Sequence, residues 1–277
     1  MSAKTSIEWT QNADGTEGRS WNPFMGCSIK STGCKNCYAQ SIARRFSGPG
    51  KPFHGLINHY GKWNGVMRTA SEKTLLSPFH WPKPSRVFVN SMTDLFHENV
   101  PVEWIDKVFD VMFANPRHTF QILTKRPDRM RVYVKEWQKF QGKRVNLPPH
   151  IWLGTSCEDQ ATADERLPEL IETFAALRMV SFEPLLEQID ATRYLPHISW
   201  AIVGGESGPG ARSMTLGWAK DLVRQCRIAN VSVFVKQLGA KPVDREDIPY
   251  PISDRKGALM EEWPESLRVR EFPNVPR

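Results

Sequence analysis

The amino-acid sequence predicts an α/β protein: a complete or partial parallel βα barrel, TIM-like, with about seven strands. Short apolar, β-branched segments recur along the chain and each ends in small or polar residues, as strands buried on both faces of a parallel sheet do. Segments with helical periodicity lie between them, and parallel strands need such crossover helices. The expected strands are residues 21–26, 86–91, 119–125, 151–156, 178–184, 200–206 and 231–237.

The first expected strand, WNPFMG at residues 21–26, is followed by a group of cysteines. A doubly wound open sheet is the alternative architecture, and it usually carries a glycine-rich phosphate turn at this point. We therefore prefer the barrel and assign residues 1–46 to the cysteine loop and the first βα unit. Residues 47–85 lack clear periodicity and are expected to form an insertion or flap. Residues 240–277, rich in proline, are expected to form an ordered C-terminal strap, so that the whole chain is one domain.

Helices are expected between the strands of the remaining βα units, which span residues 86–239. Residues 162–177 begin with Thr162 as a cap and carry acidic residues in the first turn, and residues 217–229 begin at a glycine. Residues 102–114 have an apolar stripe on one helical face. This stripe consists of Trp104, Val108, Val111 and Met112.

Polar residues stand where the expected strands end. In a βα barrel the C-terminal strand ends form one rim, so these side chains should face a common cavity. Each of them, taken alone, could equally cap the helix that follows it. The rim residues are Asn90, Ser91, Thr93, Asp94, Thr124, Lys125, Thr155, Ser156, Glu183, Glu206 and Lys236.

The chain is basic, with a net charge of +7 and a sequence pI near 9.2. This balance favours a polyanionic partner without identifying one. Part of the excess is local, because residues 126–144 hold seven Lys or Arg against Asp128 and Glu136. Two interpretations of this segment stay open: a solvated helix face, or an edge that tracks phosphates.

No membrane segment is expected, because no stretch approaches the roughly 20 apolar residues needed to cross a bilayer. The start, MSAKTSIEWT, has no apolar core of a secretory signal. We therefore expect a cytoplasmic protein. In that reducing compartment structural disulfides are rare, so a tight group of cysteines indicates metal binding or catalysis.

Three of the five cysteines follow the pattern C-x6-C-x2-C at Cys27, Cys34 and Cys37. A zinc site would need a fourth ligand from elsewhere in the chain, such as His54 or His59. An iron–sulfur cluster is the other interpretation, because three thiolates leave one iron open to a small molecule. The other two cysteines, Cys157 and Cys226, are isolated on elements that are expected to be core.

The cysteine loop reads NPFMGC followed by CKNCYAQSIARRF. It resembles the radical S-adenosylmethionine superfamily, and within it the spore-photoproduct-lyase-like branch. SMTDLFHE and ILTKRPD resemble the second and third strand ends of that branch. The chain as a whole resembles the phage-associated three-cysteine-motif proteins of unknown function, through the C-x6-C-x2-C loop, VGGESG and the ending VREFP.

The resemblance implies a [4Fe–4S] cluster on Cys27, Cys34 and Cys37, with S-adenosyl-L-methionine on the free iron. An electron from an external donor would cleave this cofactor to methionine and a 5′-deoxyadenosyl radical. The superfamily's usual spacing, C-x3-C-x2-C, is three residues shorter between the first two ligands. The added loop length costs little entropy, and Gly26 and Gly33 permit a wider range of backbone conformations, so the longer spacing is compatible with cluster binding.

The resemblance and the rim chemistry together give candidate site residues. Tyr38 is expected either to pack against the cluster or adenine, or to belong to the helix core. The candidate cofactor contacts, with Tyr38, are Ser91, Thr93, Asp94, Ser156 and Glu206. The candidate contacts to a substrate or its phosphates are Lys125, Lys236, Arg126 and Arg129.

A nucleic acid, DNA or RNA, is the leading substrate, with repair or base modification as the reaction. The target base would leave the stack and enter the barrel mouth, where Trp63 or Trp81 is expected to stack on it. A second hypothesis is a zinc-stabilised protein that binds nucleic acid or a partner without catalysis. A third is a barrel hydrolase in which Asp94, Glu183 and Glu206 do acid–base work.

Overall fold

The computed structural model describes residues 2–142 and 146–274. Within this range eight strands form one sheet, in the order β1-β2-β5-β6-β7-β8-β9-β11. The short β1 (Ser2–Lys4) is antiparallel to β2, and all other neighbours are parallel. The parallel strands are β2 (Arg19–Trp21), β5 (Arg86–Val89), β6 (Thr119–Thr124), β7 (Ile151–Ser156), β8 (Leu177–Phe182), β9 (Trp200–Gly204) and β11 (Ser232–Gln237).

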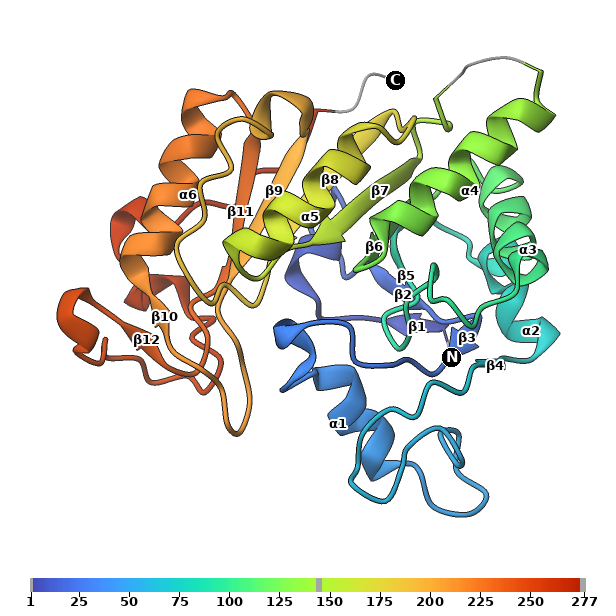
Figure 1. The fold of residues 1–277 in the computed structure, drawn as a ribbon, viewed down its shortest axis with the longest axis horizontal. Coiled ribbons are helices and arrows are strands. Elements are labelled where there is room, and N and C mark those ends of the chain that lie inside the picture. The colour runs from blue at the N-terminus through green and yellow to red at the C-terminus, as the bar shows by residue number, and fades with distance from the viewer. Residues whose placement is uncertain (1, 143–145, 275–277) are drawn as a thin grey trace.

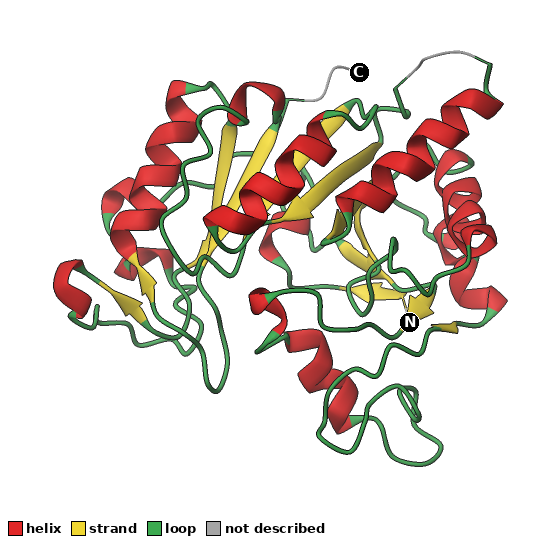
Figure 2. Cartoon of the chain, in the orientation of Figure 1, coloured by secondary structure: helices red, strands yellow, loops and turns green. Residues whose placement is uncertain are grey.

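The sheet is curled and does not close, so the predicted parallel βα barrel is confirmed in its partial form (Figure 1). Helices cover its convex face (Figure 2). They are α3 (Val102–Phe113), α4 (Pro127–Phe140), α5 (Gln160–Ile171) and α6 (Leu216–Ile228). Two further helices, α1 (Tyr38–Arg45) and α2 (Glu72–Leu75), precede β5 in the chain. Among the described residues, no helix combines the length and the apolar character that a bilayer crossing requires.

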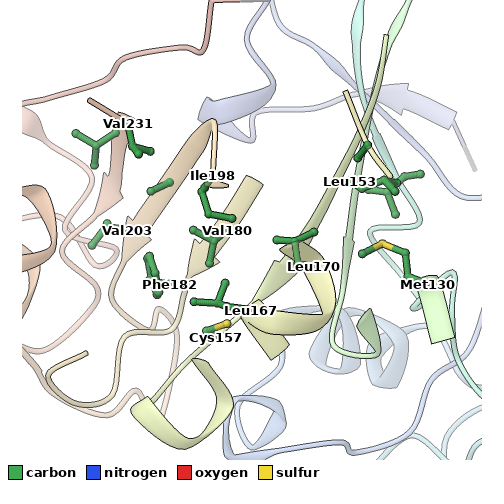
Figure 3. Close-up of a cluster of buried hydrophobic side chains, with 14 of the residues drawn as sticks. Met130, Leu153, Cys157, Leu167, Leu170, Val180, Phe182, Ile198, Val203 and Val231 are labelled. Carbon is green, nitrogen blue, oxygen red and sulfur yellow. The ribbon is translucent and has the colours of Figure 1, made fainter. Parts of the chain in front are cut away.

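The core between helices and sheet is apolar and contains both isolated cysteines. Figure 3 shows Cys157 beside Leu167 of α5 and Phe182 of β8. Cys157 and Cys226 are each 0% exposed, so they serve as small hydrophobic core residues. Six of the expected strands, at 86–91, 119–125, 151–156, 178–184, 200–206 and 231–237, agree with the observed ones to within two residues at either end.

The first expected strand, 21–26, was wrong in its bounds. β2 ends at Trp21, and β3 (Phe24–Met25) instead pairs antiparallel with β4 (Arg68–Thr69). Pro23 separates the two strands. Proline has no backbone N–H to donate to a sheet ladder, so the chain leaves the main sheet at this point.

The helix expected at 162–177 begins earlier and ends earlier, at Gln160 and Ile171. Thr162 is not its cap. The Asp159 side chain accepts from the Thr162 backbone N–H at 2.8 Å, and the Thr162 hydroxyl accepts from the Asp159 N–H at 3.1 Å. These reciprocal bonds form a capping box, which makes Asp159, three residues before Thr162, the N-cap of the helix.

The concave face changes character along the strands. Near their amino ends Trp152, Trp200 and Phe234 pack with Trp9 into an aromatic cluster. Side chains alternate between the two faces of a strand, so residues two and four positions further on share this concave side. After the apolar Met179 and Ile202, this side carries small or polar residues, which are Gly154, Ser156, Ser181, Gly204 and Lys236. The half-barrel therefore has an apolar floor and a polar mouth.

The strap protects the edge strand β11. The Val235 N–H donates to the Val269 carbonyl at 2.9 Å, and Arg270 forms an antiparallel bridge with Phe234. Trp263, 1% exposed, joins the core from the same segment. A second small pairing, β10 (Met214–Thr215) with β12 (Pro242–Val243), is parallel. Covering an edge strand in this way removes a site of unwanted strand pairing.

We expect Leu167→Ala to lower the free energy of unfolding by about 2 to 5 kcal/mol, because Leu167 is fully buried between α5 and the sheet. The matched control is Ile228→Ala, since Ile228 is 67% exposed at the end of α6. Urea unfolding of both variants measures the difference. Equal losses in the two variants would contradict the assigned core.

Candidate functional site

The cysteine loop begins at a close approach that only glycine permits. Gly26 has a φ of 107°, and its carbonyl accepts a hydrogen bond from the Thr93 hydroxyl. A Cβ at Gly26 would lie 2.1 Å from the Val66 carbonyl oxygen. The loop then carries the three cysteines and leads into α1, on the side of the sheet where the parallel strands have their carboxyl ends (Figure 1).

The residue after the first cysteine, Ser28, is held by the loop that follows β5. The Asn99 N–H donates to Nδ1 of His97 at 3.0 Å, so Nε2 carries the ring proton and donates to Ser28 Oγ at 2.7 Å. Burial, and then the positive charge of Arg126, lowers the pKa of His97. The imidazole is therefore neutral at pH 7.

The same serine contacts a charged network. Arg126 Nη2 donates to Ser28 Oγ at 3.0 Å, and Ser28 Oγ donates to Glu98 Oε1 at 3.3 Å. The Arg126 guanidinium also donates to Asp94 Oδ2 at 3.1 Å and to the Glu98 carboxylate. The guanidinium is shared between these two carboxylates, so one cation serves two acids in fixing this part of the loop.

The second attachment lies beside Cys34. The Gly33 N–H donates to Glu158 Oε1 at 3.1 Å, and the Thr32 hydroxyl donates to Asp159 Oδ2 at 3.0 Å. Both acids directly follow β7. A Cβ at Gly33 would lie 2.9 Å from the Glu158 carboxyl carbon, so glycine is needed for this contact too.

Glu158 is fully buried and doubly paired. Its Oε2 lies 2.9 Å from Lys125 Nζ and 3.0 Å from Arg166 Nη1. Burial alone would raise the pKa of Glu158, but Lys125 and Arg166 lower it to about 2. The carboxylate is therefore ionised at neutral pH and can hold the loop backbone with a charge-assisted hydrogen bond.

The third attachment lies beside Cys37. Asn36 Nδ2 donates to Glu206 Oε2 at 2.8 Å and to the Gly210 carbonyl at 2.9 Å. Arg212 donates to Glu206 from its backbone N–H and its guanidinium, and to the Thr32 carbonyl at 3.0 Å. Burial opposes ionisation of Glu206, yet the bonds from Arg212 and Asn36 give it a lowered pKa.

Each cysteine thus has a neighbour that is held by a carboxylate from a different strand end. We call Glu98, Glu158 and Glu206 the three carboxylate anchors. They follow β5, β7 and β9, and each is paired with a cation that belongs to the protein. The loop is consequently fixed across the mouth of the half-barrel at three separated points.

The three thiols are free and lie within electrostatic reach of one another. Burial raises the pKa of Cys27, Asp94 raises it further and Arg126 lowers it, and thiolates at Cys37 and Cys34 also raise it. In the described part of the chain no three His, Cys, Asp or Glu side chains stand in the arrangement of a metal site. The donor set, three thiols in one loop, nevertheless fits an iron–sulfur cluster in its chemistry.

Neither histidine named as a zinc ligand completes this set. The His54 carbonyl accepts from the Arg68 guanidinium, and the His59 ring lies against Tyr60 with centroids 3.7 Å apart. Within residues 2–142 and 146–274, neither ring joins the cysteines in a metal-holding group.

The candidate cofactor residues after β5 are engaged inside the protein. Ser91 Oγ donates to Asn22 Oδ1 at 3.2 Å, and the Tyr38 hydroxyl donates to the Ser91 carbonyl at 2.9 Å. Thr93 contacts the Gly26 carbonyl, and Asp94 accepts from hydroxyl, backbone and guanidinium groups that follow β6. These residues position the cysteine loop, and so does Glu206.

Other polar groups lie at the mouth without supporting the loop. Ser156 pairs in register with Ser181, so their side chains lie together on the concave face. Glu183 follows Ser181 by two residues and forms an ion pair with Lys236, each 19% exposed. The Asn90 side chain, 3% exposed, has no hydrogen-bond partner among the described residues. These groups are the ones with capacity for a bound molecule.

The sequence reasoning missed several positioning residues. Glu158 stands two residues beyond Ser156 and so lies outside the expected rim. Asn36 lies inside the CKNC motif, and Arg212 lies in an irregular loop after β9. The only sequence signal was their closeness to strand ends and cysteines, because their partners are distant in the chain.

The basic segment 126–144 is largely committed within the protein. Arg126 is 5% exposed and shared between carboxylates, and Arg129 donates to backbone carbonyls that follow β5. Arg131 forms ion pairs with Glu169 of α5 and with Glu172, which directly follows that helix. Residues 143–144 lie outside the described residues. This segment therefore offers no row of free cations along α4.

The two tryptophans expected to stack on a base are buried, and that expectation was wrong. Trp63 is 6% exposed and packs edge-on against Phe53 in the core of the insertion. Trp81 is 7% exposed and packs against His118. Both indoles are used in folding, since a large ring in a loop-rich segment supplies most of its apolar contact.

Two open hollows on the surface do not coincide with this site. One, of about 380 Å³, is lined by residues around Asn115, and the other, of about 370 Å³, lies between α4 and the end of α5. Neither includes a residue of the cysteine loop or of the mouth.

Comparison with known families gives one match. A family model described as "Protein of unknown function (DUF5131)" matches residues 4–264. No curated protein and no solved structure matches the chain.

We expect Glu158→Gln to lower the free energy of unfolding by about 3 to 5 kcal/mol at neutral pH, because Lys125 and Arg166 would lose a buried counter-charge. The folded pKa of about 2 lies below the ordinary 4.5. The stabilisation is therefore complete above pH 4.5 and is lost as the pH falls through 2. The difference between wild type and variant should shrink over that range.

Urea unfolding at neutral pH and in acid measures this effect. The matched control is Glu136→Gln, whose exposed pair with Lys139 should contribute less than about 1 kcal/mol. A Glu158→Gln protein as stable as wild type at neutral pH would contradict the anchoring role.

Proposed function

Since the chain belongs to the DUF5131 family of proteins of unknown function, we propose its function from its own side chains: it is an iron–sulfur enzyme of the radical S-adenosylmethionine type that acts on a nucleic acid. The observation that carries the proposal is the set of three carboxylate anchors, one beside each free cysteine. Fixing the neighbour of each thiol keeps the three thiols in one arrangement, which a shared ligand would require. The mouth of a parallel half-barrel is where this fold puts its chemistry.

Cys27, Cys34 and Cys37 would hold a [4Fe–4S] cluster, since the other two cysteines, Cys157 and Cys226, are buried in the hydrophobic core. When bound, such a cluster with one open iron supplies an electron to S-adenosylmethionine and so generates a carbon radical. The electron itself must come from an external donor. The protein's own part is to bind, orient and shield.

The residues at the mouth are suited to binding the cofactor's amino-acid end. The Glu183 and Lys236 pair offers a negative and a positive group side by side, which complements an ammonium and a carboxylate on one molecule. Ser156 adds a hydroxyl on the same face. Below them the aromatic cluster around Trp200 excludes water from the floor, which protects a reactive species from side reactions.

A nucleic-acid substrate is supported by the net charge of +7. A base inside a duplex cannot reach a pocket in the protein, so the target must be unstacked or single-stranded.

The hydrolase alternative has less support, because its carboxylates are already engaged. Asp94 is shared with Arg126, Glu206 with Arg212 and Glu183 with Lys236. A carboxylate that is held by a cation of the protein is less available to take a proton from a substrate or return one. The zinc alternative differs from the proposal in its metal and in its lack of turnover.

We expect the full chain, reconstituted anaerobically with iron and sulfide, to bind about four irons per chain, as one [4Fe–4S] cluster requires. Its reduced electron paramagnetic resonance spectrum should shift when S-adenosylmethionine is added, and 5′-deoxyadenosine should then be released. Cys27→Ala should lose both properties. Cys226→Ala is the matched control, because that thiol is fully buried away from the loop.

A colourless protein that binds one zinc would overturn the proposal in favour of the second hypothesis. Iron binding with an unchanged spectrum on cofactor addition would leave an iron–sulfur protein that uses another ligand, and the radical activity would be rejected.

A further inference from the structure

The positive charge of the chain is concentrated in one segment. Residues 18–71 contain eight Lys or Arg and no Asp or Glu. The rest of the chain carries 29 Lys and Arg against 30 Asp and Glu. The whole positive excess therefore comes from the segment that holds the cysteine loop, α1 and the first part of the insertion.

This segment forms a lobe with its own core. Ala43 of α1, Phe53, Leu56 and Trp63 pack together with Met25 and with the apolar sides of two of the cysteines. Figure 1 shows α1 and the following loops projecting from the carboxyl ends of the parallel strands. We call residues 35–68 the basic lobe. Its core makes it a fixed surface next to the mouth.

The cations of the basic lobe point to solvent or lie along its backbone. Lys62 Nζ donates to the Lys35 carbonyl at 3.2 Å, and the Arg68 guanidinium donates to the His54 carbonyl. No described carboxylate forms an ion pair with any of the lobe's cations, and most of these side chains are exposed. They are Lys35, Arg44, Arg45, Lys51, Lys62 and Arg68.

The lobe also exposes aromatic rings. Tyr60 is 75% exposed, with the His59 ring tilted against it at a centroid distance of 3.7 Å, and Phe46 is 45% exposed at the end of α1. Arg45 lies over the Phe46 ring, 5.9 Å from its centroid. Cations interleaved with exposed rings are typical of surfaces that bind single-stranded nucleic acid, where phosphates meet cations and unpaired bases stack on rings.

An anionic membrane is the competing partner for such a surface. Membrane binding in the interfacial plane uses a continuous apolar face, usually on an amphipathic helix. Here Tyr60 stands on a glycine-rich turn apart from α1, and α1, on which Tyr38 and Ile42 are exposed with Phe46 at its end, has only eight residues and so offers a short apolar face. The observations therefore favour a strand whose bases and phosphates alternate.

We propose that the basic lobe is the docking surface for single-stranded nucleic acid, with phosphates on Arg44, Arg45 and Lys51 and bases against Tyr60 and Phe46. It holds the strand beside the cysteine loop, so that one unpaired nucleotide reaches the mouth. The inference rests on the proposed function in that the docked strand is taken to be the substrate.

The test is fluorescence anisotropy of the full chain with labelled oligonucleotides, one of single-stranded DNA, one of single-stranded RNA and one of duplex DNA. We expect both single strands to bind more tightly than the duplex. The ratio of the affinities for single-stranded DNA and single-stranded RNA shows which of the two is the preferred ligand. The triple variant Arg44→Ser, Arg45→Ser, Lys51→Ser should bind at least about tenfold more weakly. Its slope of log affinity against log salt should fall by about 2, as expected for three lost contacts to a single strand.

The matched control removes the same charge elsewhere, with Lys107→Ser, Lys220→Ser and Arg227→Ser on α3 and α6. These side chains are exposed and far along the chain from the lobe, and the control should keep its salt slope. Tyr60→Ala should weaken single-strand binding about tenfold. Phe140→Ala, which removes a ring that is 89% exposed at the end of α4, should not.

Equal losses in the two triple variants would overturn the inference, because they would show an effect of net charge alone. So would binding to vesicles that contain anionic lipid together with no binding to any oligonucleotide. The measurement needs neither iron nor S-adenosylmethionine, so a negative result leaves the cluster experiment standing, and a failed cluster experiment leaves this one standing.

Discussion

Charge-assisted hydrogen bonds to three carboxylates hold the cysteine loop at the mouth of the half-barrel. Glu98, Glu158 and Glu206 come from the ends of different strands, and each reaches a residue next to one cysteine. A carboxylate placed close to thiolates would repel them, and here four cations, Arg126, Lys125, Arg166 and Arg212, stand against the three anchors and Asp94. The anchors therefore act mainly as short-range hydrogen-bond acceptors, which lets an irregular loop keep one shape. Burial and Asp94 still raise the pKa of Cys27.

The sheet makes this arrangement feasible, because parallel strands bring their carboxyl ends to one side. Residues more than a hundred positions apart, such as Gly33 and Glu158, become hydrogen-bond partners at 3.1 Å. The same parallel order puts an aromatic floor under the mouth and an apolar, helix-covered core behind it. Fold and site thus share one cause: the alternation of faces along each strand decides which residues build the core and which remain at the rim.

Much of the fold could be read from the sequence, because apolar β-branched runs such as 151–156 and 231–237 carry a local signal that tertiary contacts do not override. The first strand could not, since Pro23 ends it for a reason of backbone hydrogen bonding that hydrophobicity does not express. At the site, the cysteines were visible as a pattern. Glu158 was not, because its partners Gly33, Lys125 and Arg166 are scattered along the chain and only the sheet brings them together. The sequence does not show that Trp63 and Trp81 are buried, because both lie in an aperiodic segment, where burial produces no periodic pattern of apolar residues.

The main sheet ends at β1 on one side and β11 on the other, and these edges do not pair with each other. A closed cylinder admits only what can be passed in through its end. An open arc has a free side as well as an end. Under the proposed function, this geometry would let a strand enter at an interior position, so that a nucleotide in the middle of a continuous chain is reached as well as one at a terminus.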